Sequence, residues 1–215
     1  MRITSAVTIA TLAATMGLTA TTSANAAAGT GHPAGKPRIA GVTGAADVRR
    51  TYHDDADIRS FAFTARAAPY TRGPIPTPGG GSLPGAPNDA VGTVKITHYS
   101  AEQDRTFTAE GEVDSLVTAP GYATLTAVIT TVSPDGPDWV GRRLGFSVYD
   151  AGRDTPGHSR DRVGYSWEFM NLTKDHAGEW AEPEVGTAMA PAPFAPVVTG
   201  GYTVTHADLP PLPPS

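Results

Sequence analysis

Apolar side chains recur at every second position through most of this 215-residue chain, and this period constrains its fold more than any other feature. A period of two is that of a β-strand, in which successive side chains lie on opposite faces. An amphipathic helix instead repeats its apolar face about every 3.6 residues. The best helical candidate, Glu179 to Met189, is interrupted by Pro183 and Gly186. The residues predicted to share one core are Phe61, Phe63, Val94, Ile96, Phe107, Val113, Leu125, Ile129, Phe146, Val148, Tyr165 and Trp167.

The alternation is cut into segments by turn signals. Ala119-Pro120-Gly121 separates two of the segments, and Ser133-Pro134-Asp135-Gly136-Pro137 follows the second of them. Proline and glycine at such positions favour tight turns between strands. The sequence therefore predicts an all-β protein, a single antiparallel β-sandwich or small β-barrel of about seven strands with a disordered N-terminal tail.

The same reading divides the chain into regions. Residues 27–56 are rich in Ala and Gly without a clear period, so we expect a flexible N-terminal tail before a β-domain at residues 57–206. Within the domain, residues 69–90 are so dense in Pro and Gly that they predict a long surface loop. Residues 207–215 are rich in proline and predict an extended C-terminal tail.

Residues 1–26 have the features of a signal peptide. Arg2 is their only charged residue, an apolar run follows at residues 6–14, and Ala24-Asn25-Ala26 fits the small-residue requirement of signal peptidase. The run is too short and too interrupted by threonine to serve as a stable membrane anchor. The sequence therefore predicts a secreted, extracellular protein, with cleavage between Ala26 and Ala27.

Charge and cysteine content exclude several classes of function. The chain has 16 basic and 21 acidic residues and a net charge of −5, with no run of four basic residues. This balance argues against nucleic acid or an anionic membrane as the main partner. There is no cysteine, which excludes disulfides, thiol catalysis and thiolate metal sites. Stability must then come from a hydrophobic core or from a bound ion.

Two segments carry a resemblance to a protein family. Residues 113–128, Val-Asp-Ser-Leu-Val-Thr-Ala-Pro-Gly-Tyr-Ala-Thr-Leu-Thr-Ala-Val, resemble the pattern V-x-C-L-x-V-x-G-x-x-A-x-V-x-G-x-V, and residues 141–152 resemble its next element, G-x-x-x-x-F-x-V-x-D-x-G. These patterns are typical of small secreted actinobacterial β-domain proteins, some labelled repetin-like. The chain departs from them with Ser115 in place of Cys and Ala127 in place of Gly. The resemblance implies a fold and no catalytic group.

The most site-like cluster of acids is Asp150, Asp154 and Asp161, on either side of a bend at Gly152. Several carboxylate oxygens on a loop that can bend are what Ca²⁺ requires, although the spacing is not that of an EF-hand. We therefore take these three residues as candidate calcium ligands. The alternative is that Asp150 and Asp161 cap a hairpin loop through hydrogen bonds to backbone amides.

Two other acidic groups are interpreted as solvated surface. Glu110, Glu112 and Asp114 alternate on one strand, so they are expected to project from its outer face, where they could also bind a cation. The segment from His53 to Asp57 lies between the expected tail and the first strand. It could contribute to a metal site, but ligands so close in sequence rarely complete one, and a solvated acidic junction is the favoured interpretation.

The remaining features favour binding over catalysis. There is no G-x-S-x-G motif, and Ser166 lies within a strand. A carboxylate pair for glycoside hydrolysis could be drawn from Glu110, Glu112, Asp150 and Glu168, but only their separation decides. Trp167 is in phase with the core, whereas Trp139 and Trp180 lie on loops, where aromatic rings can stack on sugars.

The sequence thus predicts a secreted, non-enzymatic β-domain protein with a structural or ligand-binding role. Cell-wall or extracellular polysaccharide is a candidate partner, through the tryptophans on loops. The alternatives are a small secreted hydrolase that uses carboxylates and a ligand-carrying barrel.

Overall fold

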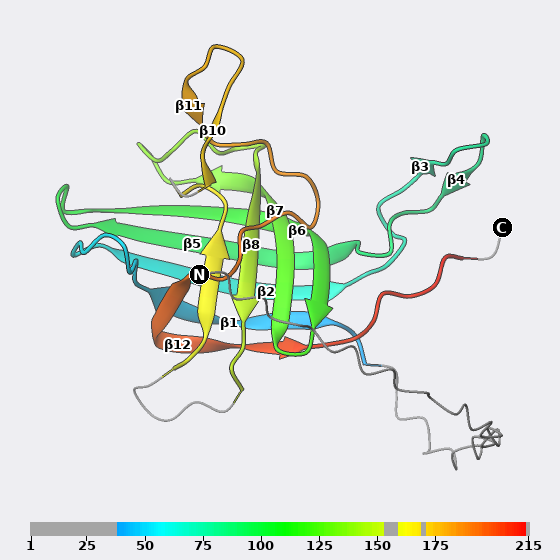
Figure 1. Cartoon of the computed structure of the whole chain (residues 1–215), viewed down its shortest axis with the longest axis horizontal. Coiled ribbons are helices and arrows are strands. Elements are labelled where there is room, and N and C mark those ends of the chain that lie inside the picture. Colours follow the sequence, from blue (N-terminus) through cyan, green and yellow to red (C-terminus); the bar gives the residue numbers. More distant parts are fainter. Residues whose placement is uncertain (1–37, 153–158, 169–170, 214–215) are drawn as a thin grey trace, which may run out of the picture. The chain divides into compact units, whose positions relative to one another are not determined.

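The computed structural model describes residues 38–152, 159–168 and 171–213 (Figure 1). The expected signal peptide at residues 1–26 lies outside these ranges. Within them there is no α-helix, and so no helix long and apolar enough to cross a membrane. The eight main strands are β1 (Gly41–Val48), β2 (Ile58–Ala67), β5 (Ala90–Ser100), β6 (Arg105–Ala119), β7 (Tyr122–Val132), β8 (Arg143–Tyr149), β9 (Arg162–Tyr165) and β12 (Ala195–Thr205).

These eight strands form a closed antiparallel barrel. Each one pairs with its neighbour along the chain, and β12 pairs back with β1, so that the order around the barrel is β1-β12-β9-β8-β7-β6-β5-β2. Closure gives each of these eight strands a paired neighbour on both sides, although β9 pairs with only Ala195 and Pro196 of β12. The all-β prediction is confirmed, and the number of main strands is one more than the seven expected.

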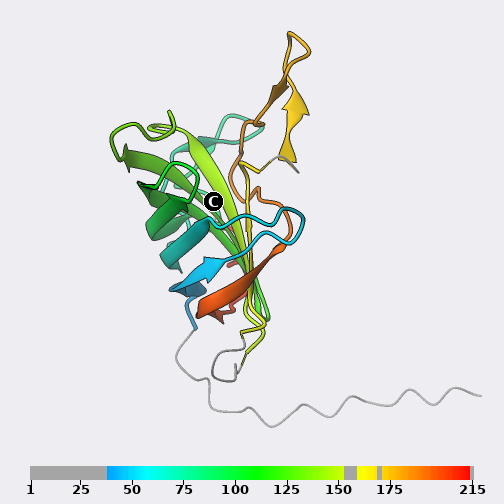
Figure 2. The same ribbon diagram turned by 90° about the vertical axis from the view of Figure 1, so that its left-hand side faces the viewer.

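Two short hairpins lie outside the barrel sheet. One pairs β3 (Ile75–Pro76) with β4 (Ser82–Leu83), and the other pairs β10 (Thr173–Lys174) with β11 (Trp180–Ala181). Both views show the β10–β11 hairpin projecting away from the barrel (Figures 1 and 2). It belongs to the long segment that joins β9 to β12.

Strand β1 corrects the prediction that residues 27–56 form a flexible tail. Residues 41–48 pair with both β2 and β12, and the side chains of Val42, Ala46 and Val48 are buried. The sequence Gly-Val-Thr-Gly-Ala-Ala-Asp-Val resembles a linker because its residues are small. Small residues are required here: a Cβ at Gly44 would overlap the carbonyl oxygen of Gly201 and lie against Tyr202. Residues 27–37 lie outside the described ranges.

The predicted core is largely confirmed. Ten of the twelve residues have 4% or less of their surface exposed, whereas Phe107 and Trp167 are half-buried at one end of the barrel. The centre of the core is aromatic: the Phe61 ring lies 5.0 Å from that of Tyr165, and the Phe63 ring lies 5.4 Å from those of Phe146 and Tyr202.

The Pro/Gly-rich loop predicted at residues 69–90 contains the β3–β4 hairpin and ends where β5 begins at Ala90. Its base is held by Asp89, whose Oδ2 accepts hydrogen bonds from the amides of Thr71, Arg72 and Ala86 at 2.8–3.0 Å. The hydroxyl of Tyr70 donates to the carbonyl oxygens of two prolines in the C-terminal segment. The loop and the C-terminal segment are therefore tied to each other and to the barrel.

Candidate functional site

A cavity of about 480 Å³ opens at the end of the barrel where β2 and β6 begin and β5 ends. Its apolar lining combines strand residues with residues from two connecting segments: Phe61, Ile96, Phe107, Ala109, Trp139 and Trp167. Its polar rim includes Arg50, Asp57, Arg59, His98 and Glu168. The site therefore joins an aromatic interior to a charged entrance.

The aromatic wall is built by the connection between β7 and β8. The Trp139 amide donates to the carbonyl of Pro137, and the Trp139 carbonyl accepts from the amide of Arg142, so that the connection turns back on itself. The Trp139 ring then lies 5.0 Å from the Trp167 ring, which packs in turn on Phe61 and Phe146. Both tryptophans are partly buried against the core.

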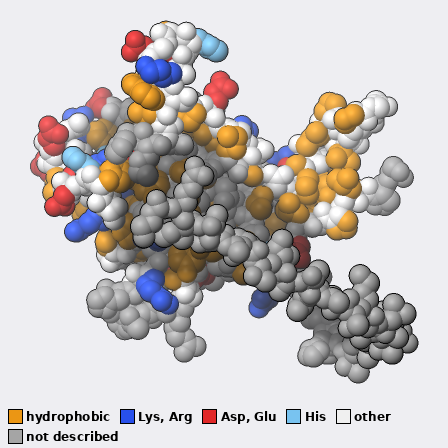
Figure 3. All heavy atoms as spheres, in the orientation of Figure 1, with side chains coloured by type: hydrophobic (Ala, Val, Ile, Leu, Met, Phe, Trp, Pro, Cys, Tyr) orange, Lys and Arg blue, Asp and Glu red, His pale blue; other side chains and the backbone are white. Residues whose placement is uncertain are grey.

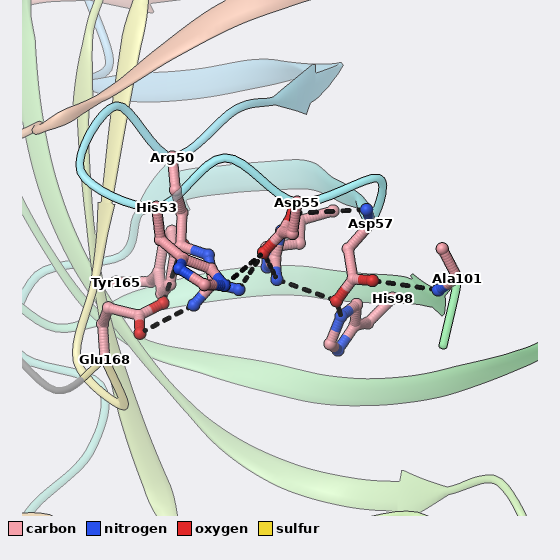
Figure 4. Close-up of polar contacts among 9 residues, drawn as sticks. Arg50, His53, Asp55, Asp57, His98, Ala101, Tyr165 and Glu168 are labelled. Carbon is pink, nitrogen blue, oxygen red and sulfur yellow. Dashed lines mark hydrogen bonds and ion pairs between the residues drawn. The ribbon is translucent and has the colours of Figure 1, made fainter. Parts of the chain in front are cut away.

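Arg59, the second residue of β2, lies at the centre of the charged contacts at the rim. Its guanidinium makes a two-pronged contact with the carboxylate of Asp55, at 3.0 and 2.9 Å, and a further contact of 2.9 Å with Asp57. Figure 4 labels both carboxylates and shows Asp57 also reaching the amide of Ala101. The Arg59 side chain is only 8% exposed. A guanidinium so far from water requires such partners, because an unpaired buried charge is strongly unfavourable.

Arg50 extends this network across the entrance. It contacts the carboxylate of Asp55 on one side and Oε1 of Glu168, at 3.3 Å, on the other. Arg50 follows β1, whereas Glu168 belongs to the segment after β9, so the contact joins two parts of the chain that are 118 residues apart. We refer to Arg50, Asp55, Asp57, Arg59, His98 and Glu168 as the rim network.

Asp57 connects the rim network to the turn between β5 and β6. Its Oδ1 accepts a hydrogen bond from the amide of Ala101 at 2.9 Å, and its Oδ2 lies 2.8 Å from Nε2 of His98. Burial alone would raise the pKa of Asp57, but the hydrogen bonds from His98 and Ala101 outweigh it and lower this pKa. Hydrogen bonds from Arg59 hold the pKa of Asp55 well below its usual range. Both carboxylates are therefore ionised at neutral pH.

Two tyrosines adjoin the other end of the network. The Tyr165 hydroxyl donates to Oε2 of Glu168 at 3.2 Å. Burial, followed by the charge of Glu168, raises the pKa of Tyr165 and raises the pKa of Tyr52 to about 12. Both phenols stay protonated at neutral pH and can act as hydrogen-bond donors.

The chemistry of this arrangement suits binding better than acid catalysis. Each of the three carboxylates contacts at least one guanidinium. A general acid needs a carboxyl group whose pKa is raised toward neutral pH, and the pKa values of Asp55 and Asp57 are lowered. The rim network thus forms a fixed, ionised border around an apolar cavity.

Two of the three candidate calcium ligands, Asp150 and Asp161, lie at the opposite end of the barrel strands from the cavity. Asp161 is 1% exposed and accepts hydrogen bonds from the amides of Ala151 and Tyr202, at 2.9 and 2.8 Å. Asp150 accepts from the amides of Gly152 and Val204, at 2.7 and 2.8 Å. β9 pairs with only Ala195 and Pro196 of β12, so the amides of Tyr202 and Val204, farther along β12, have no partner on β9. The carboxylates of Asp161 and Asp150 accept their hydrogen bonds instead.

This geometry corresponds to the loop-capping alternative. Asp154 lies outside the described ranges, so its place relative to Asp150 and Asp161 is not defined. In the described part of the chain, no group of three or more His, Asp or Glu side chains is arranged to hold a metal ion. Calcium binding at this loop stays a prediction.

The acidic stripe predicted on β6 is interrupted. Glu110 and Glu112 are exposed, but the pairing of β6 with β7 shifts between Val113 and Ser115, which leaves Asp114 as an extra residue. Asp114 is buried and bonds to Arg143 at 2.7 Å and to Thr126 at 2.6 Å. Its burial and its contacts with Arg143 and Thr126 show that the expectation of a solvated Asp114 is wrong.

The prediction of a solvated acidic junction from His53 to Asp57 is also wrong in part. His53 and Asp54 are exposed, as expected. Asp55 and Asp57 instead belong to the rim network. The sequence did carry a signal, because Arg59 is in phase with Phe61 and Phe63, and His98 is in phase with Val94 and Ile96. Polar residues in phase with a core at the end of a strand point into that end of the barrel.

The two tryptophans on loops have different surroundings. Trp139 lines the cavity, whereas Trp180 is 67% exposed on the β10–β11 hairpin, with Nζ of Lys174 4.8 Å from its ring centre.

Charged side chains of both signs gather on the side of the molecule where the β1–β2 connection lies, and hydrophobic ones cover much of the β3–β4 hairpin (Figure 3).

Comparison of the chain with family models, with curated proteins and with solved structures finds no match. The resemblance to secreted actinobacterial β-domain proteins therefore stays a prediction.

Proposed function

We propose that this protein is an exported binding protein that takes up a small, mainly aromatic molecule in the cavity at the end of its barrel. The observation that carries this proposal is the combination of an aromatic cavity of about 480 Å³ with a partly buried charged border. Ligand sites typically have volumes of about 300–1,000 Å³, are mostly apolar, and contain a few fixed polar groups that orient the ligand.

The rigidity of the rim supports binding. Arg59 is held by three contacts with Asp55 and Asp57, and Asp57 is held further by His98 and Ala101. A border whose side chains are already fixed loses little conformational freedom when a ligand binds. Export, which the leader sequence predicts, would place this cavity where it meets extracellular small molecules.

A hydrolase is a weaker candidate. The carboxylates at the cavity contact guanidinium groups, and the pKa values of Asp55 and Asp57 are lowered rather than raised. The carboxylates of Asp150 and Asp161 accept hydrogen bonds from backbone amides at the other end of the strands. Neither of these two sets of acidic residues resembles an acid paired with a base or nucleophile.

The proposal can be tested with N-phenyl-1-naphthylamine, an uncharged aromatic dye that fluoresces more strongly in apolar surroundings. We expect saturable fluorescence enhancement with the wild-type protein. Ala109→Leu places extra carbon atoms in the cavity lining and should abolish the enhancement. Ala119→Leu is the matched control, because Ala119 lies exposed at the other end of the same strand. Equal enhancement by both variants would contradict binding in the cavity.

A further inference from the structure

We propose that the ligand of this cavity is a compact aromatic cation, such as a benzylammonium or an aryl quaternary ammonium compound, rather than an anion. This inference rests on the proposed function and specifies the chemical class that the site selects.

The charge of the rim network favours a cation. Two guanidinium groups, those of Arg50 and Arg59, meet three carboxylates, those of Asp55, Asp57 and Glu168. The carboxylates of the network therefore outnumber its guanidinium groups by one, next to an apolar cavity. Charge interactions at such a boundary are stronger than in bulk water, because the apolar side screens them less.

The guanidinium groups offer little to an anion. Arg59 directs both of its terminal nitrogens at Asp55 and Asp57, and Arg50 directs its terminal nitrogens at Asp55 and Glu168. Arg50 Nε has no acceptor within the described residues, but it is buried from solvent, so a ligand anion would not reach it either. An anion would have to displace a resident carboxylate and leave that carboxylate unpaired.

The lining suits a cation with an apolar body. Trp139 and Trp167 lie side by side with their ring centres 5.0 Å apart, and Phe107 is half-buried at the same mouth. The faces of aromatic rings, tryptophan above all, attract ammonium groups, and clusters of such rings are used to recognise quaternary ammonium ligands. Asp135 also lines the cavity, and its carboxylate lies 3.4 Å from the guanidinium of Arg105 on the exposed surface.

The test compares three ring compounds of similar shape by isothermal titration calorimetry. Phenyltrimethylammonium is the cation, tert-butylbenzene replaces its nitrogen with carbon, and benzenesulfonate is an anion. We expect phenyltrimethylammonium to bind the wild-type protein about tenfold more tightly than tert-butylbenzene, as cation–π and charge contacts worth about 1–2 kcal/mol predict. Benzenesulfonate should bind more weakly than either.

Two variants identify the source of the preference. Glu168→Gln removes one carboxylate charge with little change of shape, and it should bring the affinity for phenyltrimethylammonium close to that for tert-butylbenzene. Glu112→Gln removes an exposed carboxylate from the outer face of β6 and should leave the preference unchanged. If Glu168→Gln does not fold, the comparison of the three compounds on the wild-type protein still decides.

The outcomes separate this inference from the proposed function. If tert-butylbenzene binds as tightly as phenyltrimethylammonium, or if benzenesulfonate binds most tightly, the cationic class is wrong while binding in the cavity stands. If none of the three compounds binds and N-phenyl-1-naphthylamine does not bind either, both proposals fail. A preference for the cation that disappears in Glu168→Gln and persists in Glu112→Gln supports both.

Discussion

The guanidinium of Arg59 contacts both carboxylate oxygens of Asp55, at 3.0 and 2.9 Å, from within the barrel end. This pair joins the first residues of β2 to the connection that precedes it. The same guanidinium also reaches Asp57, whose other contacts are on β5 and the β5–β6 turn. Arg59 thus links β2, the connection before it and β5 at the entrance of the cavity.

Replacement of Arg59 by Met should destabilise the protein by about 3 kcal/mol, because it leaves Asp55 and Asp57 short of a buried positive partner. Urea unfolding monitored by circular dichroism measures this loss. Lys95→Met is the matched control, since Lys95 pairs with Glu110 on the exposed surface and such pairs contribute about 1 kcal/mol or less. Similar losses for the two variants would contradict the structural role of the rim network.

The rim network also predicts how stability depends on pH. The pKa values of Asp55 and Asp57 are lower in the folded protein than the ordinary value of 3.8. Their stabilising contribution is therefore fully present above pH 4 or so, and it is lost as the pH falls through the lowered folded-state values. Thermal unfolding between pH 6 and pH 2 should show this loss. Asp55→Asn should flatten the profile below about pH 4, whereas Asp138→Asn, at an exposed loop carboxylate, should keep the wild-type slope.

The position of β1 in the barrel predicts the effect of enlarging Gly44. Gly44 has φ 139°, and a Cβ there would overlap the backbone of β12. Gly44→Ala should therefore cost about 2–3 kcal/mol of unfolding free energy through overpacking and backbone strain. Gly79→Ala separates backbone strain from overpacking. Gly79 also has a positive φ, but a Cβ there would meet no other atom within 4 Å. If both variants lose the same stability, close contact between β1 and β12 is contradicted.

The capping role of Asp161 predicts a loss of stability that does not depend on calcium. Asp161→Ala leaves the amides of Ala151 and Tyr202 without their acceptor and should cost about 2–4 kcal/mol. The melting temperature should fall equally in calcium and in a chelator. If calcium raises the melting temperature of the wild-type protein and Asp150→Ala abolishes that rise, the loop is an ion site, as the sequence first suggested.

The parts of the fold that follow from strand periodicity were predictable. Phe61, Phe63, Phe146 and Val148 are buried because residues two apart share a face, and that relationship needs no knowledge of the strand's neighbours. β1 was missed because its small residues are explained only by the close approach of Gly201 and Tyr202, which lie far away in the sequence.

The candidate site could be predicted only in part. The alternation placed Arg59 and His98 in phase with the core, but their partners could not be found from the sequence. Asp55 and Glu168 meet through Arg50 across a separation of more than one hundred residues, which depends on closure of the barrel. Asp114 was expected to be solvated because the sequence does not show that Thr126 and Arg143, on β7 and β8, enclose its carboxylate.

The most direct test of binding in the cavity uses the three tryptophan side chains as internal reporters. Indole N–H resonances of the ¹⁵N-labelled protein are followed by NMR while N-phenyl-1-naphthylamine is added. We predict saturable shifts for Trp139 and Trp167, which line the cavity, and no comparable shift for Trp180, which lies exposed on the β10–β11 hairpin. Shifts confined to Trp180, or no saturable shift at Trp139 and Trp167, would contradict the account.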